Sequence, residues 1–102
     1  MSKARDFREL RNAASSASAL MKTLGHEDRL MVLCHLAEGE QSVGELAEQL
    51  DISQSGLSQH LARMRAEQLV EARRESQNVY YSIKGTELQK IIACLHNIYC
   101  GR

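Results

Sequence analysis

The chain has 102 residues, and its 13 Lys and Arg residues balance its 13 Asp and Glu residues. This balance excludes a uniformly basic coat for non-specific adhesion to nucleic acid or membrane, and the length leaves no room for a second independent core. Hydrophobic residues make up 43% and charged residues 25%, which is typical of a globular protein rather than a disordered one. We therefore expect a single domain over residues 1–102.

The sequence offers no signal for export or for a membrane. The first ten residues, MSKARDFREL, are charged and lack an apolar stretch, and no apolar run approaches the ~20 residues of a membrane span. We expect a cytoplasmic protein without a membrane partner, in a compartment that keeps thiols reduced. The 3 cysteines cannot all pair within one chain, so a disulfide scaffold is excluded.

The first half of the chain predicts helices separated by glycines and caps, because proline is absent. Residues 5–24 form an apolar face at helical spacing, which includes Leu10, Ala13, Ala14, Ala17, Leu20, Met21 and Leu24. A second helix runs from near Glu27 to Gly39. Ser42 and Glu45 then have the spacing of a capping box, which begins a short third helix. Residues 51–53 form a tight turn, and a fourth helix over 54–67 buries Leu57, Leu61 and Met64.

The period changes after this helix. Residues 69–74 and 79–83 alternate like strands, and residues 75–78 between them predict a hairpin turn. Thr86 and Gln89 have the spacing of a second capping box, which begins a last helix. Its apolar face contains Leu88, Ile91, Ile92, Leu95, Ile98 and Tyr99. The predicted fold is mainly α with a small β-hairpin: a dimeric winged helix-turn-helix of order α-α-α-α-β-β-α.

The segment 42–67 matches the helix-turn-helix of DNA-binding proteins, and 69–83 would be its wing. The outer face of the second helix is polar, and it presents Gln54, Ser55, Ser58, Gln59, His60 and Arg63. These side chains hydrogen-bond to base edges and phosphates, whereas a merely solvated helix usually carries Glu and Lys pairs. Arg73, Arg74 and Gln77 at the hairpin predict contacts with an adjacent minor groove or backbone. If the hairpin is considered without the helix-turn-helix, the alternative to a DNA-contacting wing is a polar hairpin that faces only solvent.

The first and last helices, 5–24 and 86–100, are candidates for a two-fold interface, since their apolar stripes are long for terminal helices on a small domain. The alternative is that the last helix simply packs on the core of its own protomer. A dimer would present two reading helices about one DNA turn apart (~34 Å), so the expected partner is double-stranded DNA with an inverted-repeat operator.

The chain resembles the ArsR/SmtB family of winged-helix repressors. The resemblance is carried by Leu24-Gly25-His26, by Arg29-Leu30, by the run 42–46 (SVGEL), by the run 53–61 (SQSGLSQHL) and by 79–83 (VYYSI). It implies a homodimeric transcriptional repressor that leaves its operator when an inducer binds or reacts.

The sequence departs from the metal-sensing members of that family. Their Cys-Val-Cys motif is replaced by Ser42-Val43-Gly44, and the last helix has Glu87 and His96 but no Asp-x-His pair. We therefore expect neither of the familiar metal sites and no cofactor.

Cys34 and Cys100 resemble the dithiol of the BigR/SqrR-type branch of the family, in which reactive sulfur species link the two thiols. The resemblance implies that such a link, or oxidation, lowers operator affinity here. The chemistry needs a thiolate and a second thiol within reach, so the last helix would have to run past the second. A buried structural thiol is the alternative for Cys34. Cys94 lies about 240° from Cys100 around the helix, so both are not expected to face Cys34.

Three further hypotheses stay open. A metal-responsive repressor could use Cys94, His96 and Cys100. A thiol-dependent enzyme would need Cys34 as nucleophile with His35 or His96 as base, but no Gly-rich loop or oxyanion-hole motif supports it, and we expect no enzymatic activity. The protein could also bind DNA without an inducer, as an anti-silencer or activator.

Overall fold

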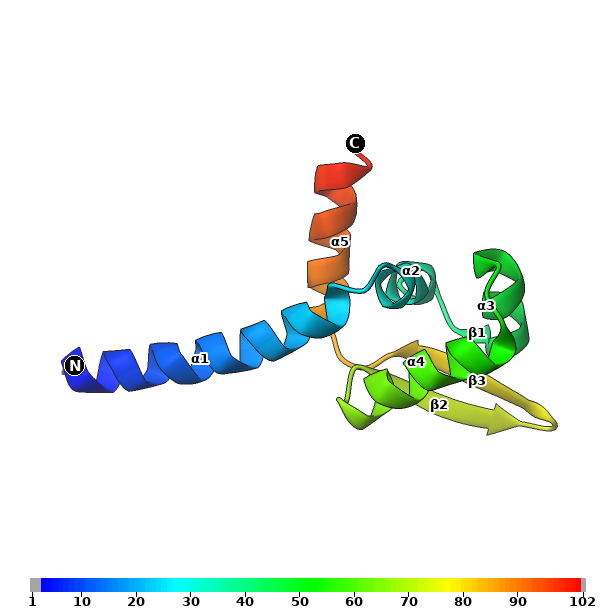
Figure 1. Ribbon diagram of the computed structural model, residues 1–102, viewed down its shortest axis with the longest axis horizontal. Helices are drawn as coiled ribbons and strands as arrows, with labels where there is room; N and C mark the ends of the chain where they lie inside the picture. The colour runs from blue at the N-terminus through cyan, green and yellow to red at the C-terminus, as the bar shows by residue number, and fades with distance from the viewer. Residues whose placement is uncertain (1–2, 102) are drawn as a thin grey trace.

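The structure is a computed structural model that describes residues 3–101 (Figure 1). Over this range the helices are α1 (Lys3–Leu24), α2 (Glu27–Leu36), α3 (Val43–Leu50), α4 (Gln54–Ala66) and α5 (Glu87–Tyr99). The strands are β1 (Gln41–Ser42), β2 (Val70–Glu75) and β3 (Asn78–Ile83). The predicted winged helix-turn-helix order, mainly helical with a small hairpin, is confirmed.

The sheet is antiparallel, with the strand order β1-β3-β2. β1 was not predicted, because two residues are too short to show alternation; it pairs Gln41 with Tyr81. The hairpin turn is also shorter than the predicted 75–78. Glu75 and Asn78 pair directly across the strands, which leaves Ser76 and Gln77 as a two-residue turn. Ser76 has a φ of 58°, the left-handed backbone that tight hairpins require.

The core lies where α2, α3, α4 and the start of α5 meet the sheet. Its buried side chains are Val32, Leu33, Leu36, Leu46, Leu57, Leu61, Met64, Val70, Ile83, Leu88 and Ile92. The stripe predicted for α4 is confirmed, since Leu57, Leu61 and Met64 are at most 1% exposed. Burial of these three side chains fixes which face of α4 remains at the surface.

The capping box predicted at the start of α5 is wrong. Thr86 makes no side-chain cap hydrogen bond. Its φ of −97° and ψ of −21° are already helical, whereas a capping hydroxyl works from an extended backbone. The first turn is instead closed by the backbone, where the N–H of Lys90 donates to the carbonyl of Thr86 at 3.0 Å.

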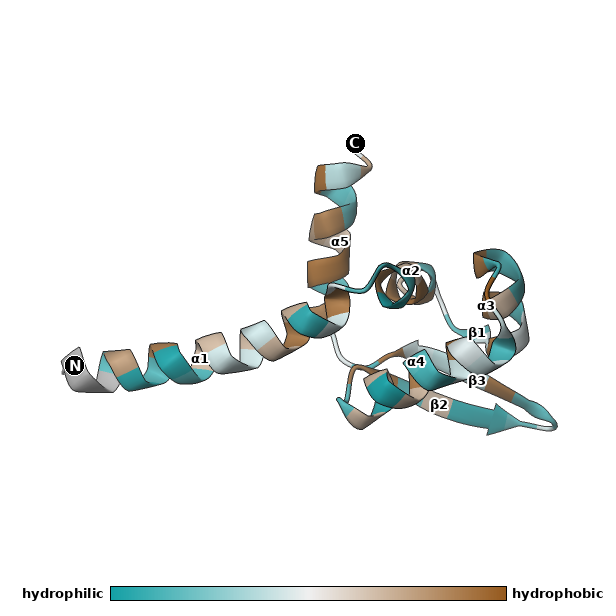
Figure 2. Ribbon diagram, viewed as in Figure 1, coloured by the Kyte–Doolittle hydropathy of each residue, from teal (hydrophilic) through white to brown (hydrophobic). Residues whose placement is uncertain are grey.

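α1 extends away from the other elements, and its N-terminal end lies far from them (Figure 1). The radius of gyration is 15.8 Å, larger than the ~13 Å of a compact chain of this length. Figure 2 shows apolar bands along α5 and near both ends of α1. Several large apolar side chains there are exposed: Phe7, Leu10 and Met21 on α1, and Ile98 and Tyr99 on α5. Much of the two predicted stripes therefore does not contribute to the protomer's own core.

Among residues 3–101, the helices are too short or too polar to cross a membrane.

Candidate nucleic-acid interface and thiol pair

α4 is held in place by caps at both helices of the helix-turn-helix. The Ser42 hydroxyl accepts from the N–H of Glu45 at 3.2 Å, and the Glu45 carboxylate accepts from the N–H of Ser42 at 2.9 Å, so the predicted capping box is confirmed. Asp51 ends α3 with a left-handed φ of 57°. Ser53 then caps α4 by accepting from the N–H of Gly56 at 3.0 Å. These local bonds set the angle between the two helices.

The outer face of α4 is exposed and polar, as its sequence predicts. Five of the six side chains predicted to contact DNA are exposed: Gln54, Ser55, Ser58, Gln59 and Arg63. The Ser53 and Ser55 hydroxyls lie 3.4 Å apart at the start of the helix. Amide and hydroxyl groups on one face can both donate to and accept from base edges.

His60, the sixth, is placed differently. It is half-buried, and its ring centroid lies 4.7 Å from that of His26, at the start of α2. Burial and the neighbouring imidazole of His26 lower the pKa of His60 from its ordinary value. The imidazole packs against α2, so its contact with DNA stays a prediction.

Arg63 is tethered within α4. Its Nε lies 3.4 Å from the Glu67 carboxylate, one helical turn later. The other oxygen of Glu67 accepts from the hydroxyl of Thr23, at the end of α1, at 2.5 Å. Arg63 can therefore reach a phosphate only by exchanging this partner, which is cheap for an exposed pair.

On the wing, Arg73 is already paired. Its guanidinium donates two hydrogen bonds to Glu40, at 2.7 and 3.0 Å, lies 3.4 Å from Glu75 and stands over the ring of Tyr80 at 5.0 Å. The hydrogen bonds to Glu40 raise the pKa of Arg73 further above its ordinary value and hold the pKa of Glu40 below its own. Glu40 and Glu75 thus offset the positive charge of Arg73, a residue that the sequence predicts to contact DNA.

Arg74 points to the other face of the wing, because side chains alternate along a strand. It is exposed and lines a pocket of about 360 Å³ together with Arg65 of α4. Arg65 was not among the residues predicted from the sequence to contact DNA, because it lies about 200° around α4 from Arg63 and so on another face of the helix. Two guanidinium groups that face one pocket suit an anion such as phosphate.

The structure also brings the wing tip to the start of α4. Gln77 and Gln54 line one cleft of about 270 Å³, with Ser42, Val43, Gly44, Asn78 and Val79. The two glutamines come from segments that lie apart in the sequence. Their common cleft makes the helix and the wing parts of one surface.

The thiols lie on α2 and on and just after α5, and these two helices are in contact. Cys34 of α2 lines a pocket of about 220 Å³ with Ile92, Ala93, His96 and Asn97 of α5. Cys34 is half-buried, whereas Cys94 and Cys100 are exposed. Burial, then the charges of Cys100 and Glu38, raise the pKa of Cys34 above its ordinary value. The C-terminal half of α5 thus lies beside Cys34, and that helix ends at Tyr99, directly before Cys100.

The alternative metal set is not assembled within one protomer. Among the described residues, Cys94, His96 and Cys100 do not form a group with converging ligand atoms, although His96 lines the Cys34 pocket. The group that does converge is one that the sequence did not suggest: His26, Asp28 and His60, whose ligand atoms lie within 4.8 Å of one another.

Known proteins share both the sequence and the fold. Residues 26–72 match the family described as bacterial regulatory protein, arsR family. The chain is 43% identical over 95 residues to the transcriptional activator HlyU of Vibrio cholerae, which covers 93% of this chain and 88% of that protein. It is 42% identical over 88 residues to the biofilm growth-associated repressor of Agrobacterium fabrum, which covers 86% of this chain and 75% of that protein.

The solved structures agree. Reduced HlyU from V. cholerae superposes with a TM-score of 0.87 at 44% identity and covers 91% of this chain and 98% of its own. A homodimeric winged helix-turn-helix DNA-binding domain from Mycobacterium bovis gives a TM-score of 0.77 at 28% identity. The match covers 88% of this chain and 83% of that domain. These relatives are regulators of transcription, not enzymes, and they give no support to the hypothesis of Cys34 as a catalytic nucleophile. The chain belongs to the ArsR family of DNA-binding transcriptional regulators.

Proposed function

We propose that this protein is a homodimeric repressor that binds an inverted-repeat operator and releases it when Cys34 and Cys100 are linked by reactive sulfur species or an oxidant. The observation that supports the proposal is the packing of α5 against α2, where Cys34 shares a pocket with residues from the C-terminal half of α5. The thiols lie apart from the polar face of α4 and the wing, so their chemistry would act on DNA binding through the fold.

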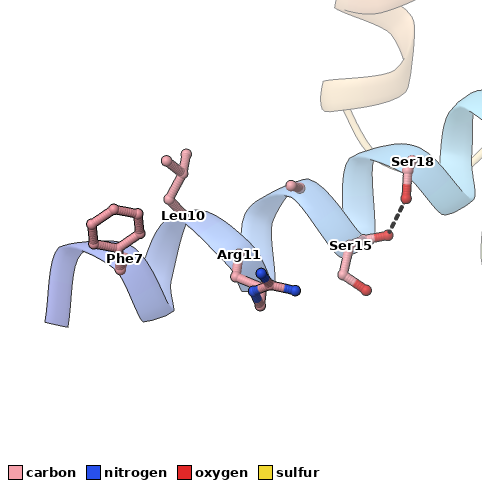
Figure 3. Close-up of a pocket in the computed structure, with 6 residues that line it drawn as sticks. Phe7, Leu10, Arg11, Ser15 and Ser18 are labelled. Atoms are coloured by element: carbon pink, nitrogen blue, oxygen red, sulfur yellow. Dashed lines mark hydrogen bonds between the residues drawn. The ribbon is translucent and has the colours of Figure 1, made fainter. Parts of the chain in front are cut away.

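A dimer is supported by the apolar side chains that α1 leaves at the surface. Phe7 is 73% and Leu10 67% exposed, and with Arg11, Ala14, Ser15 and Ser18 they line a shallow, open groove along α1 (Figure 3). Exposed apolar surface of this kind is typical of an interaction site. The M. bovis relative is described as homodimeric, and a second copy of this chain is the occupant that we propose for the groove.

In the proposed complex, α4 enters the major groove, with the side chains at its start deepest. Gln54, Ser55, Ser58 and Gln59 would read base edges, while Arg63, Arg74 and Gln77 would contact the backbone or the adjacent minor groove. Arg65 joins this set because it shares the pocket of Arg74. Arg73 would contribute less than the sequence suggests, since Glu40 and Glu75 already pair with it.

The order of the thiol reactions follows from the environments of the two sulfurs. A raised pKa keeps Cys34 protonated at neutral pH, so the first attack falls to the exposed Cys100. Its thiolate breaks an S–S bond of a polysulfide, retains one sulfur as a persulfide and releases the shortened polysulfide. Cys34, after losing its proton to solvent, attacks the Cys100 sulfur and expels hydrosulfide. The two thiols are oxidised to a disulfide, and the polysulfide takes up the two electrons.

A bridge between Cys34 and Cys100 would change how the α4 helices of the two protomers are oriented relative to each other. A direct disulfide needs Cα atoms within ~7 Å, and a bridge with additional sulfur atoms spans more. Either bridge pins α5, one of the proposed dimer helices, to α2. A coupling of ~1–3 kcal/mol between the thiols and the DNA surface is enough for a switch.

The test begins with reduced protein and a pool of random duplexes, from which the preferred site is selected. Binding to that duplex is then measured for reduced protein and for protein treated with inorganic tetrasulfide, peroxide or zinc, at one salt concentration. We expect tetrasulfide to release the wild type and the matched control Cys94→Ser, but not Cys100→Ser. Mass spectrometry should find Cys34 joined to Cys100. Release of the Cys100→Ser protein would refute the dithiol switch.

Activation is the second candidate, because a relative at 43% identity carries the name transcriptional activator. One form of activator, an anti-silencer, would displace another DNA-binding protein instead of blocking the polymerase. Transcription from a promoter that contains the selected site separates the two. Purified polymerase alone should make less transcript when a repressor is added, and an anti-silencer should raise the transcript only when the silencing protein is present.

A further inference from the structure

The start of α2 and the middle of α4 bring together three side chains that can bind a metal ion. His26, Asp28 and His60 each offer one ligand atom, and these atoms lie within 4.8 Å of one another. The imidazoles of His26 and His60 are tilted by 56°, with centroids 4.7 Å apart. His60 and Asp28 are half-buried and His26 is exposed, so the group is open to an ion from solvent on one side.

We propose that His26, Asp28 and His60 form a binding site for a divalent ion of the zinc class, separate from the thiols. Two imidazoles and one carboxylate are a donor set that suits Zn²⁺ with a fourth position for water. Bonds of about 2.1 Å at tetrahedral angles separate neighbouring ligand atoms by roughly 3.4 Å. The present spacing therefore needs the ligand atoms to approach one another by at most about 1.4 Å, which is within the reach of side-chain rotation.

The two arginines near the metal-binding group, Arg29 and Arg63, already have other partners. Arg29 donates from Nε to the carbonyl of Thr23 at 2.9 Å and from Nη2 to that of Lys22 at 3.4 Å. Arg63 pairs with Glu67 at 3.4 Å. Both guanidinium groups raise the local positive potential. The Asp28 carboxylate therefore supplies the negative charge of the site.

Metal binding competes with the present cap of α2. The Nδ1 atom of His26 accepts a hydrogen bond from the backbone N–H of Asp28 at 3.2 Å. A neutral imidazole has one lone pair, on either Nδ1 or Nε2. Whichever nitrogen binds the ion, Nδ1 can no longer accept from Asp28, and the amide of Asp28 is released. This release is a local signature that metal bound at the cysteines would not produce.

The test uses untagged full-length protein in which all three cysteines are replaced by serine, so that thiolates do not compete for zinc. Circular dichroism and thermal unfolding first establish that the variant folds. Zn²⁺ is then titrated by calorimetry, and the backbone amide and imidazole nitrogen signals are followed by NMR. We expect one equivalent per chain, a shift of both His26 and His60 signals, and a displaced Asp28 amide signal.

Substitutions in this background locate the ligands. Asp28→Asn and His26→Gln should each weaken zinc binding at least tenfold, and His60→Gln should do the same if it remains folded. The matched control His96→Gln removes a histidine outside the group and should bind zinc as its parent does. Unaltered affinity in both Asp28→Asn and His26→Gln, or no binding to the parent at millimolar zinc, would overturn the proposal.

Discussion

Thr23 and Glu67 are joined by a hydrogen bond of 2.5 Å that ties the end of α1 to the end of α4. Thr23 is completely buried, and the second oxygen of the Glu67 carboxylate lies 3.4 Å from Arg63. One acidic side chain thus connects a proposed dimer helix to the proposed reading helix. The contact offers a route by which a change at the dimer interface would reach the DNA surface.

Replacing Thr23 with valine tests this connection. Valine keeps the volume but leaves a carboxylate oxygen without its donor, so we expect unfolding to become easier by about 1–2 kcal/mol. Thr86→Val is the matched control, because the Thr86 hydroxyl makes no cap hydrogen bond, and it should change stability little. Chemical denaturation at one fixed protein concentration measures both, since a dimer's stability depends on concentration. Equal effects of the two substitutions would contradict the role given to Thr23.

The two wing arginines should behave differently on DNA. Arg74→Ala removes a side chain proposed to bind phosphate, so the slope of log affinity against log salt should become shallower by about 1 for each phosphate that the protein no longer neutralises. Arg73→Ala should change the slope less, because Glu40 already pairs with Arg73.

Glu40→Gln checks the cause of this difference. Without the carboxylate, Arg73 has one competing partner fewer, and DNA affinity should rise at low salt. Binding isotherms at several salt concentrations measure all three variants. A larger decrease of the salt dependence for Arg73→Ala than for Arg74→Ala would show that the ion pair opens on DNA.

The raised pKa of Cys34 predicts slow modification at neutral pH. Below its pKa the thiol is protonated and unreactive, and a raised pKa lowers the thiolate fraction at any given pH. The alkylation rate of Cys34 in the Cys94→Ser, Cys100→Ser protein should therefore be low at pH 7 and increase as the pH rises. Because this double variant lacks the charge of Cys100, its midpoint should lie below that of a Cys94→Ser protein.

Glu38→Gln provides the matched test of the electrostatic cause. Glu38 also raises the pKa of Cys34, so removing its charge should move the midpoint of the rate profile to lower pH. Glu48→Gln, an exposed glutamate on α3, should leave it in place. Iodoacetamide labelling followed by mass spectrometry gives the rates. An unchanged midpoint in Glu38→Gln would mean that burial alone controls Cys34.

The groove on α1 predicts where the dimer can be broken. Phe7→Glu places a charge in a surface that a second copy is proposed to cover, and losing the burial of such a side chain costs about 1.5–3 kcal/mol. Because a two-fold dimer contains Phe7 twice, the dimer dissociation constant should then rise by about two to four orders of magnitude. Ser16→Glu, on the opposite side of α1, is the control. Sedimentation equilibrium measures both, and a Phe7→Glu protein as dimeric as wild type would exclude the groove from the interface.

Local sequence patterns were sufficient for most of the elements. The period of apolar residues predicted the helices, the buried stripe of α4 and the hairpin, because these features depend on neighbours three or four residues apart in a helix or two apart in a strand. Ser42 and Glu45 revealed their capping box for the same reason. The pattern failed at Thr86, where the residue types fit a cap but the backbone is helical. It also could not show the two-residue strand β1.

The sequence by itself determined the order of the elements, the polar face of α4 and the presence of three thiols. Only the tertiary structure decided which of these groups meet: Arg73 with Glu40 across 33 residues, His60 with His26, and Cys34 with the passing helix α5. The physical reason is that such contacts depend on the angles at which helices and sheet pack. Those angles result from the shape of the whole core and leave no periodic trace in the residues that they bring together.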